Sequence, residues 1–177
     1  MKHSPLNKKL LIISFSLLFS IPVQAADLFY KKNLSLYVIH DVDQSKIESK
    51  LLEITVGNYV ADAGSVIFLK GQSLHLIRDT REPKVEVLDT AVADFKLKDG
   101  LIAYIKGESL FVRRVSDAAN VSSRLVTDSQ GVVNIDIAGG VIIFIKNATT
   151  LYRVTDLDRG TAERVIYPVS EAQVSGK

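Results

Sequence analysis

The fold is decided by the stretch Gly100-Leu101-Ile102-Ala103-Tyr104-Ile105-Lys106-Gly107-Glu108-Ser109-Leu110-Phe111-Val112. On both sides of Gly107, apolar and aromatic residues recur with a period near two, which is typical of half-buried β-strands. Gly107 tolerates the positive φ angle that a tight hairpin turn requires. The stretch therefore predicts two short antiparallel strands joined by a turn.

The same hairpin pattern occurs four times along the chain. The matching segments are 28–38, 66–76, 102–112 and 142–152, and the last of them has one extra residue in its turn. A lysine precedes each turn, and an aromatic residue lies two places before each lysine (Tyr30, Phe68, Tyr104 and Phe144). Because the spacing is close to 40 residues, the chain is predicted to repeat one structural unit.

Two further strands accompany most of the hairpins. A leading strand is visible before the hairpins of the second, third and fourth repeats, each time followed by a glycine turn (Gly64, Gly100 and Gly140). A strand is also predicted after every hairpin, at 51–56, 84–88, 124–127 and 163–167. Four short antiparallel strands in about 40 residues correspond to one blade of a β-propeller.

The chain also resembles the irregular β-propeller proteins found outside the cytoplasm, related to the propeller of the Tol system. The resemblance rests on Gly100–Tyr104 followed by Ser109–Phe111, and on Gly140–Phe144 followed by Thr150–Tyr152. It covers Leu28 to about Tyr167 and implies a scaffold type rather than an activity. The fold class is therefore expected to be all-β, with antiparallel four-stranded repeats forming about four propeller-like blades.

The way in which the blades close is left open by the sequence. The first repeat lacks a leading strand, and Ala172–Gly176 has the alternation needed to supply one from the C-terminus. An open, curved run of sheets is one alternative. Another is a half-propeller that is completed by a dimer or by a larger partner.

The first 25 residues are predicted to be a secretory signal peptide, and residues 26–177 to form a single β-repeat domain. A positive start containing Lys8 and Lys9 precedes the apolar run Leu10–Phe19, and cleavage is expected after Ala25 or Ala26. The apolar run is short for a membrane span, although an uncleaved anchor is the alternative. The protein is accordingly expected to be periplasmic or secreted, with no stable transmembrane segment after cleavage.

Charge and composition exclude several classes of function. The whole chain has 22 basic and 20 acidic residues, and it contains no cysteine and no tryptophan. Without the three lysines of the N-terminal segment the charge is close to neutral. A disulfide scaffold, a thiolate metal site, a cysteine nucleophile and a strongly basic nucleic-acid binder are therefore not expected.

Four lysines are the most regular charged feature of the sequence: Lys32, Lys70, Lys106 and Lys146. If the blades close radially, equivalent turns gather on one face, and these lysines would form a basic ring for a phosphate, an anionic polysaccharide or an acidic protein. The alternative interpretation is that the lysines only solubilise the turns and discourage edge-to-edge aggregation.

The two histidines of the repeat region have structural interpretations. His75 takes the place of an aromatic residue in the other repeats and is predicted to fill the same slot. His40 takes the place of Arg78 and Arg114, which predicts a set of polar residues at strand ends. Neither histidine has a catalytic or metal-binding partner in the pattern.

No catalytic, cofactor-binding or metal-binding residue is predicted. The acidic pairs at 41–43 and 156–158 lack the remainder of a calcium loop, and turn chemistry explains them. The sequence has no nucleophile elbow, no phosphate loop and no dinucleotide fingerprint. No cofactor is therefore expected.

The sequence favours an exported, non-enzymatic binding or scaffold protein that contacts another envelope or extracellular protein through its blade loops and turns. A carbohydrate- or envelope-polymer-binding module is the alternative, with Tyr37 and Tyr152 on exposed strand ends and the lysine face assisting. A small hydrolase that uses loop carboxylates is a second alternative. The expected partners include an anionic or glycan ligand and a second copy of the chain, but not nucleic acid.

Overall fold

A computed structural model describes residues 27–42 and 47–168 of the chain. These residues form fifteen β-strands and no helix, so the predicted all-β fold is confirmed. Two predictions lie outside the described residues, namely the signal peptide at 1–25 and the C-terminal strand at 172–176.

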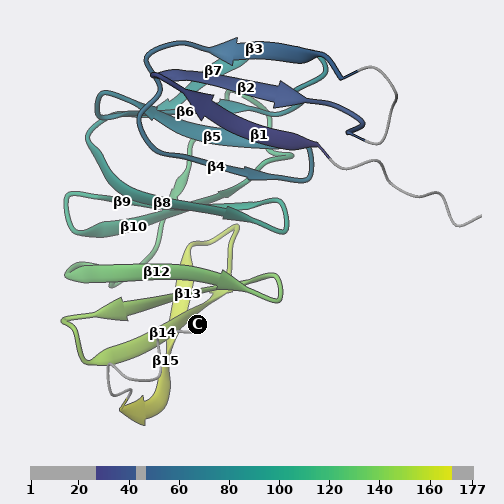
Figure 1. The fold of residues 1–177 in the computed structure, drawn as a ribbon. Helices are drawn as coiled ribbons and strands as arrows, with labels where there is room; N and C mark the ends of the chain where they lie inside the picture. The colour runs from purple at the N-terminus through teal and green to yellow at the C-terminus, as the bar shows by residue number, and fades with distance from the viewer. Residues whose placement is uncertain (1–26, 43–46, 169–177) are drawn as a thin grey trace, which may run out of the picture.

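The strands form four antiparallel sheets that follow one another along the chain, each an up-and-down meander (Figure 1). Sheet 1 contains β1 (Leu28–Lys32), β2 (Ser35–Ile39) and β3 (Ser49–Glu53). Sheet 2 contains β4 (Tyr59–Asp62), β5 (Ser65–Lys70), β6 (Ser73–Ile77) and β7 (Val85–Asp89). Sheet 3 contains β8 (Val92–Lys98), β9 (Leu101–Lys106), β10 (Ser109–Arg114) and β11 (Arg124–Leu125). Sheet 4 contains β12 (Val132–Ala138), β13 (Val141–Lys146), β14 (Thr150–Asp156) and β15 (Thr161–Pro168).

The four sheets coincide with the four predicted repeats. The leading strands are present in sheets 2, 3 and 4, and within the described residues sheet 1 has three strands, as the missing leading strand predicted. The outer strands differ somewhat from their predicted bounds: β3 begins two residues earlier than expected, and β11 is only two residues long. The loop Asp117–Ser122 takes up the chain ahead of β11, and Arg113 anchors it by donating to the carbonyls of Asp117 and Ala118.

The hairpin turns have the backbone conformation that the repeated Asn and Gly residues predicted. The φ angles are 51° at Asn33, 63° at Gly71, 54° at Gly107 and 52° at Asn147. These residue types occupy the left-handed region at little steric cost, and such turns match the twist of the flanking strands. The turn chemistry thereby fixes the register of all four hairpins.

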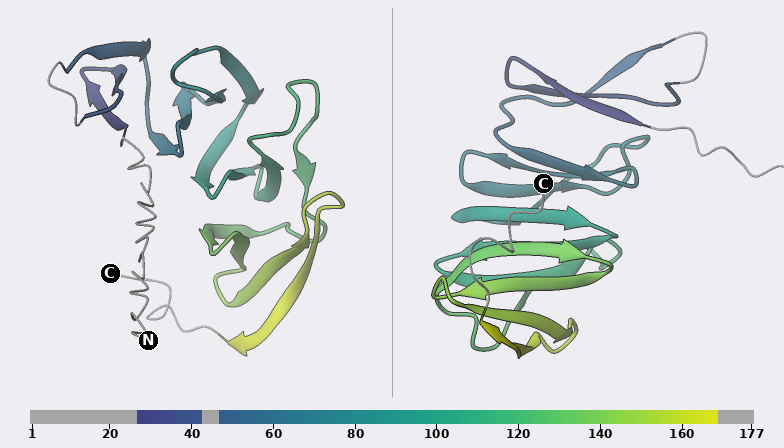
Figure 2. Two further views of the ribbon diagram at one scale, coloured as in Figure 1. Left: turned by 90° about the vertical axis from the view of Figure 1, so that its right-hand side faces the viewer. Right: turned by 60° about the horizontal axis from the view of Figure 1, so that its bottom comes forward.

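The hydrophobic core lies between the sheets rather than inside any one of them. Its three clusters each join two consecutive sheets, first sheets 1 and 2, then 2 and 3, then 3 and 4. Figure 2 shows the result from another side: the four sheets lie on an open arc, with sheets 1 and 4 at its two ends. The described residues thus form an open, curved run of sheets, and the predicted closing strand at 172–176 lies outside them.

Candidate functional site

Each sheet contains one stacked pair of rings on the two strands of its repeated hairpin, at directly opposed positions. The pairs and their centroid separations are Tyr30–Tyr37 at 5.2 Å, Phe68–His75 at 5.2 Å, Tyr104–Phe111 at 5.4 Å and Phe144–Tyr152 at 5.1 Å. His75 therefore fills an aromatic slot, as its place in the repeat predicted. Stacked pairs of this kind add to the stability gained from burial alone.

The stacked pairs all lie on the face that looks back toward the preceding sheet. Phe68 packs in the cluster shared with sheet 1, Tyr104 in the cluster shared with sheet 2, and Phe144 in the cluster shared with sheet 3. Their exposed fractions are 0%, 1% and 1%. In sheets 2 to 4 the preceding sheet therefore covers the inner ring of the stack completely.

Sheet 1 carries the same face, and no sheet formed by residues 27–42 and 47–168 covers it. We define the aromatic end face as Leu28, Tyr30, Tyr37 and Ile39, which pair across β1 and β2. Leu28 is 52% exposed, whereas Val66, its equivalent in sheet 2, is fully buried. Tyr30 and Tyr37 are half-buried. This end of the arc therefore presents an apolar and aromatic surface that the fold buries everywhere else.

The opposite end of the arc presents the complementary kind of face. We define the aliphatic end face as Ile143, Ile145, Leu151 and Arg153, on β13 and β14 of sheet 4. In sheet 3 the equivalent residues are Ala103, Ile105, Leu110 and Val112, all buried against sheet 4. The apolar members of the aliphatic end face are half-buried, and Arg153 is exposed.

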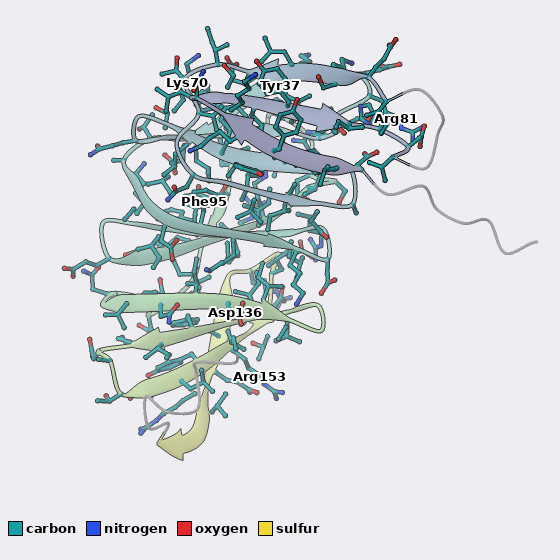
Figure 3. All side chains as sticks on the ribbon, in the orientation of Figure 1. Tyr37, Lys70, Arg81, Phe95, Asp136 and Arg153 are labelled. Carbon is teal, nitrogen blue, oxygen red and sulfur yellow. The ribbon has the colours of Figure 1, made fainter. Side chains whose placement is uncertain are left out.

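A shallow hollow marks this aliphatic end face. Ile143, Ile145 and Leu151 line it together with Asn134 and Asp136 of β12. Figure 3 shows Tyr37 on sheet 1 and Arg153 on sheet 4, at the two ends of the stack of sheets. The two end faces are therefore separate surfaces of a single chain.

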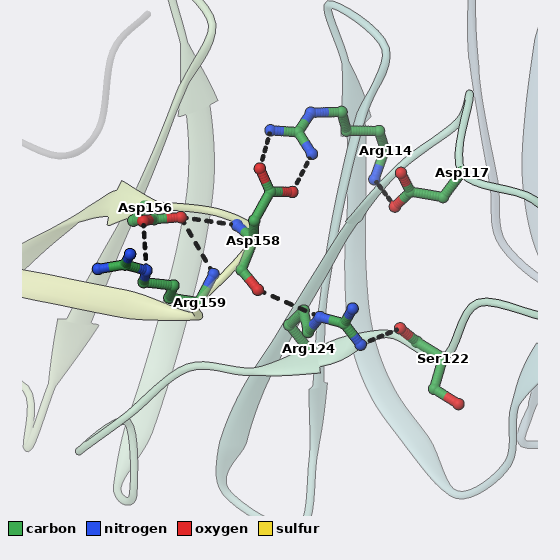
Figure 4. Close-up of polar contacts among 7 residues, drawn as sticks. All are labelled: Arg114, Asp117, Ser122, Arg124, Asp156, Asp158 and Arg159. Atoms are coloured by element: carbon green, nitrogen blue, oxygen red, sulfur yellow. Dashed lines mark hydrogen bonds and ion pairs between the residues drawn. The ribbon is translucent and has the colours of Figure 1, made fainter.

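A repeated polar contact joins consecutive sheets along one edge, where a strand-end residue of one sheet reaches the next sheet's turn. His40 Nε2 lies 3.2 Å from the carbonyl oxygen of Thr80, and Arg78 donates to the carbonyl of Val115. Arg114 donates to both carboxylate oxygens of Asp158 (Figure 4). The predicted set of polar strand-end residues therefore exists, and its members link sheets.

Carboxylates in these links have lowered pKa values. The pKa of Glu86 is lowered mainly by its hydrogen bonds from Arg78, and the pKa of Asp158 is lowered mainly by its hydrogen bonds from Arg114. The charged form of both carboxylates is therefore favoured, and it is this form that pairs with the arginines. This chemistry is that of structural ion pairs.

The four predicted lysines lie at the hairpin turns along one edge of the arc, on the left of Figure 1. Three of them contact acceptors at or just after the end of the outer strand of the preceding sheet. Lys70 Nζ lies 3.4 Å from Glu53 Oε1, Lys106 Nζ lies 2.6 Å from Asp89 Oδ1, and Lys146 Nζ donates to the carbonyl of Asp128 at 2.7 Å.

These contacts give the three lysines a structural role between sheets. Lys32 is exposed on sheet 1, and neither an ion pair nor a hydrogen bond involves its side chain within the described residues. The basic ring stays a prediction, and its charges are partly compensated by the neighbouring carboxylates.

The two tyrosines predicted as ligand aromatics are not brought together. Tyr37 lies in the aromatic end face of sheet 1, whereas Tyr152 packs against the cluster between sheets 3 and 4. Both stand in the middle of their strands, in stacked pairs, rather than at exposed strand ends. A shared glycan platform built from these two side chains is therefore not formed within one chain.

The described residues contain neither a cluster of metal-ligating side chains nor a long apolar helix. Within 27–42 and 47–168, no three metal-ligating side chains cluster together. In the same part of the chain, no helix has the length and apolar character needed to cross a membrane. The acidic turn at 156–158 uses Asp156 to accept hydrogen bonds from the backbone of Asp158 and Arg159, as turn chemistry predicted.

Sequence reasoning missed the two end faces as candidate sites. The aligned repeats already place Tyr30 and Tyr37 at the positions of Phe68 and His75. The missing information was that these positions look back toward the preceding sheet. Adding that direction to the repeat alignment would have shown that none of the other three repeats supplies a sheet that precedes the first one.

Comparison with known proteins supports the fold alone. No protein-family model matches the sequence, and no curated protein sequence matches it. Among solved structures, Hsv2 from Kluyveromyces lactis is similar, with a TM-score of 0.51 and 17% identity over 81% of this chain and 48% of the Hsv2 chain. Hsv2 from Kluyveromyces marxianus has a TM-score of 0.50 and 14% identity over 77% of this chain and 46% of that one.

A third similar structure is the N-terminal domain of Nup159, with a TM-score of 0.47 and 13% identity over 78% of this chain and 44% of that one. The similar structures are β-propeller proteins, and the chain has a β-propeller-type fold of four sheets. It spans about half the length of the solved structures it matches.

Proposed function

We propose that this chain is an exported, non-enzymatic protein-binding scaffold whose binding surface is the aromatic end face. The N-terminal segment 1–25, with its lysines, apolar run and small residues before Ala26, supports export. The proposal moves the binding surface from the blade loops, favoured by the sequence alone, to the end of the arc.

One observation carries the proposal: among the four described sheets, a preceding sheet covers this face in all but the first. Phe68 is fully buried by sheet 1, whereas the equivalent Tyr30 is only half-buried. Exposed apolar patches of this kind mark interaction sites in soluble proteins. Tyrosine is also enriched at interfaces, because its ring buries a large apolar area while its hydroxyl remains able to bond.

The face favours a protein partner over a sugar or a nucleotide. Leu28 and Ile39 extend the two tyrosine rings into a flat apolar surface, which suits another sheet or an apolar protein surface. Protein interfaces have this composition, with aromatic residues at the centre and charged residues depleted. Lys32 at the edge of the face supplies a polar rim.

The test replaces Tyr37 with a photo-crosslinking amino acid in the full chain, made in cells that export it. A matched control carries the same group at Val87, an apolar residue of β7 that is 63% exposed. Irradiation should give a discrete crosslinked protein product from position 37 and none from position 87. The absence of any crosslinked protein from position 37, Leu28 or Ile39 would remove the basis of the proposal.

A further inference from the structure

We propose that the partner of the aromatic end face is the aliphatic end face of a second copy, so that two copies close head to tail into a ring of eight sheets. This inference rests on the proposed function and names the partner of the same surface. It also gives the aliphatic end face a role.

The interface required already occurs three times in the chain. Each core cluster joins the aliphatic face of one sheet to the aromatic face of the next, as Leu110 and Val112 of sheet 3 meet Phe144 and Ile142 of sheet 4. The two end faces are the unpaired halves of this one repeating contact. A second copy covers both end faces at once. Its sheet 4 packs against sheet 1 of the first copy, and its sheet 1 packs against sheet 4 of the first copy.

The residue types on the two end faces differ from those at the equivalent buried positions between sheets, and the differences favour association of two copies. Where the other stacks are Phe68–His75, Tyr104–Phe111 and Phe144–Tyr152, the end stack has two tyrosines. On the aliphatic side, Arg153 stands where Val112 stands in sheet 3.

Tyrosine and arginine are the residue types enriched at protein interfaces, and an arginine stacks favourably on an aromatic ring. The tyrosine hydroxyl groups and the guanidinium group also keep the two end faces compatible with water before assembly. The tyrosines lie on the aromatic end face and the arginine on the aliphatic end face. In the dimer, the tyrosine rings of each copy therefore face the guanidinium group of the other copy.

The geometry of the arc permits closure. Figure 2 shows the four sheets turning in one direction around a common centre, with the end faces at the open side. Head-to-tail contacts form rings when the rotation closes, and propellers commonly have four to eight blades. Two copies give eight sheets.

A face-to-face dimer through two aromatic end faces is the competing arrangement. It would place tyrosine stacks against tyrosine stacks, a contact that occurs between none of the described sheets, where aromatic faces meet aliphatic ones. It would also leave both aliphatic end faces uncovered. The two arrangements differ in whether sheet 4 is needed for the dimer.

The experiment uses two interface variants and their mixture, measured by native mass spectrometry on the purified full-chain product. Tyr37→Asp disables the aromatic end face, and Ile143→Asp disables the aliphatic end face. Val87→Asp is the matched control, since it places the same charge at an exposed apolar residue outside both faces. Circular dichroism and thermal unfolding verify that each variant is folded, and Leu28→Asp and Arg153→Ala replace either variant that is not.

The proposal expects a dimer for the unaltered protein and for Val87→Asp, and a monomer for each end-face variant alone. Mixing the two variants restores a heterodimer, because one intact aromatic face then meets one intact aliphatic face. A dimer that survives Ile143→Asp but not Tyr37→Asp would establish the face-to-face arrangement and overturn the ring.

A monomeric unaltered protein at tens of micromolar would also overturn the proposal. If photo-crosslinking at position 37 still captured a protein of a different sequence, the proposed function would stand and only the second copy would be wrong. If it captured none, both would be wrong.

Discussion

Arg78 holds Glu86 through two parallel hydrogen bonds, with Nε 2.8 Å from Oε1 and Nη2 2.9 Å from Oε2. The remaining nitrogen of the guanidinium donates to the carbonyl of Val115 in sheet 3. One side chain thus joins two strands of sheet 2 and also ties sheet 2 to sheet 3. Bidentate, charge-assisted contacts of this kind are stronger than single neutral hydrogen bonds.

We expect Arg78→Ala to lower the free energy of unfolding by about 1–3 kcal/mol, because it leaves Glu86 and the Val115 carbonyl without their donor. Arg114→Ala, at the equivalent place in sheet 3, should cost less, since its partner Asp158 is exposed. Urea unfolding of both variants measures the difference. Equal losses would contradict the ranking.

The stacked histidine makes stability depend on pH. Burial, followed by the charge of Lys70, lowers the pKa of His75 from its ordinary value of 6.5, and its Nδ1 atom is buried without a hydrogen-bond partner. The unfolded chain therefore takes up a proton at a higher pH than the folded chain does. The contribution of His75 to the free energy of unfolding should be fully present above pH 6.5. It should be lost as the pH falls below that value.

His75→Phe should remove this part of the pH dependence, because a phenyl ring keeps the stack on Phe68 and cannot be protonated. Chemical denaturation between about pH 5 and pH 8 compares the two proteins. The difference in unfolding free energy should grow as the pH falls. A constant difference over this range would show that His75 does not titrate with folding.

Gly160 marks a close backbone approach between sheet 4 and the chain that follows β11. Its carbonyl accepts the Thr127 amide at 2.7 Å, and a Cβ atom at this position would lie 2.3 Å from the carbonyl oxygen of Leu125. We therefore expect Gly160→Ala to destabilise the protein by at least about 2 kcal/mol, combining overpacking with the cost of its positive φ.

Gly139→Ala is the matched control for this prediction. Gly139 has a similar positive φ of 56°, but an added Cβ meets nothing within 4 Å. It should cost about 1 kcal/mol, which represents the backbone term alone. Thermal unfolding of the two variants separates the terms, and similar losses would show that the approach to Leu125 is unimportant.

Lys106 contributes to the junction between sheets 2 and 3 through Asp89. Burial alone would raise the pKa of Asp89, but hydrogen bonds from Lys106, the Thr90 amide and Tyr104 outweigh it and leave the pKa lowered. A lowered carboxyl pKa adds stability above the unfolded pKa of about 3.8, and that stability is lost as the pH falls.

Lys106→Met should therefore cost roughly 0.5–1 kcal/mol at neutral pH and less in acid, whereas Lys32→Met should change little. Urea titrations at two pH values measure both. An equal effect at Lys32 would contradict the assignment of the effect to the contact between Lys106 and Asp89.

The repeat pattern was enough to predict the sheets, because period-two alternation and turn residues are local signals. It correctly predicted the positive φ of Asn33 and Gly107 and the aromatic slot of His75. The side-chain partners were not predictable, since Lys106 reaches Asp89 only after two sheets have packed. Arg113, which is 3% exposed, also stands where Ile77 stands in sheet 2, and the pattern gave no sign that its Nη2 atom would donate to backbone carbonyls.

The candidate site was hidden for a related reason. The sequence shows that Tyr30 and Tyr37 repeat the positions of Phe68 and His75, but burial depends on which sheet lies against which face. Only the order of the described sheets along the arc reveals that sheet 1 stands at one end of it. The lysines could be singled out from the sequence because charged residue types are identified directly from it. Whether an apolar face is covered depends on packing, which the sequence does not show.

The mass of the purified protein in solution tests the central claim most directly. Sedimentation equilibrium at several micromolar concentrations determines that mass without any labels or variants. The account predicts twice the mass of one chain, because the two end faces of each copy are covered by those of the other. A mass equal to a single chain at every concentration would contradict it.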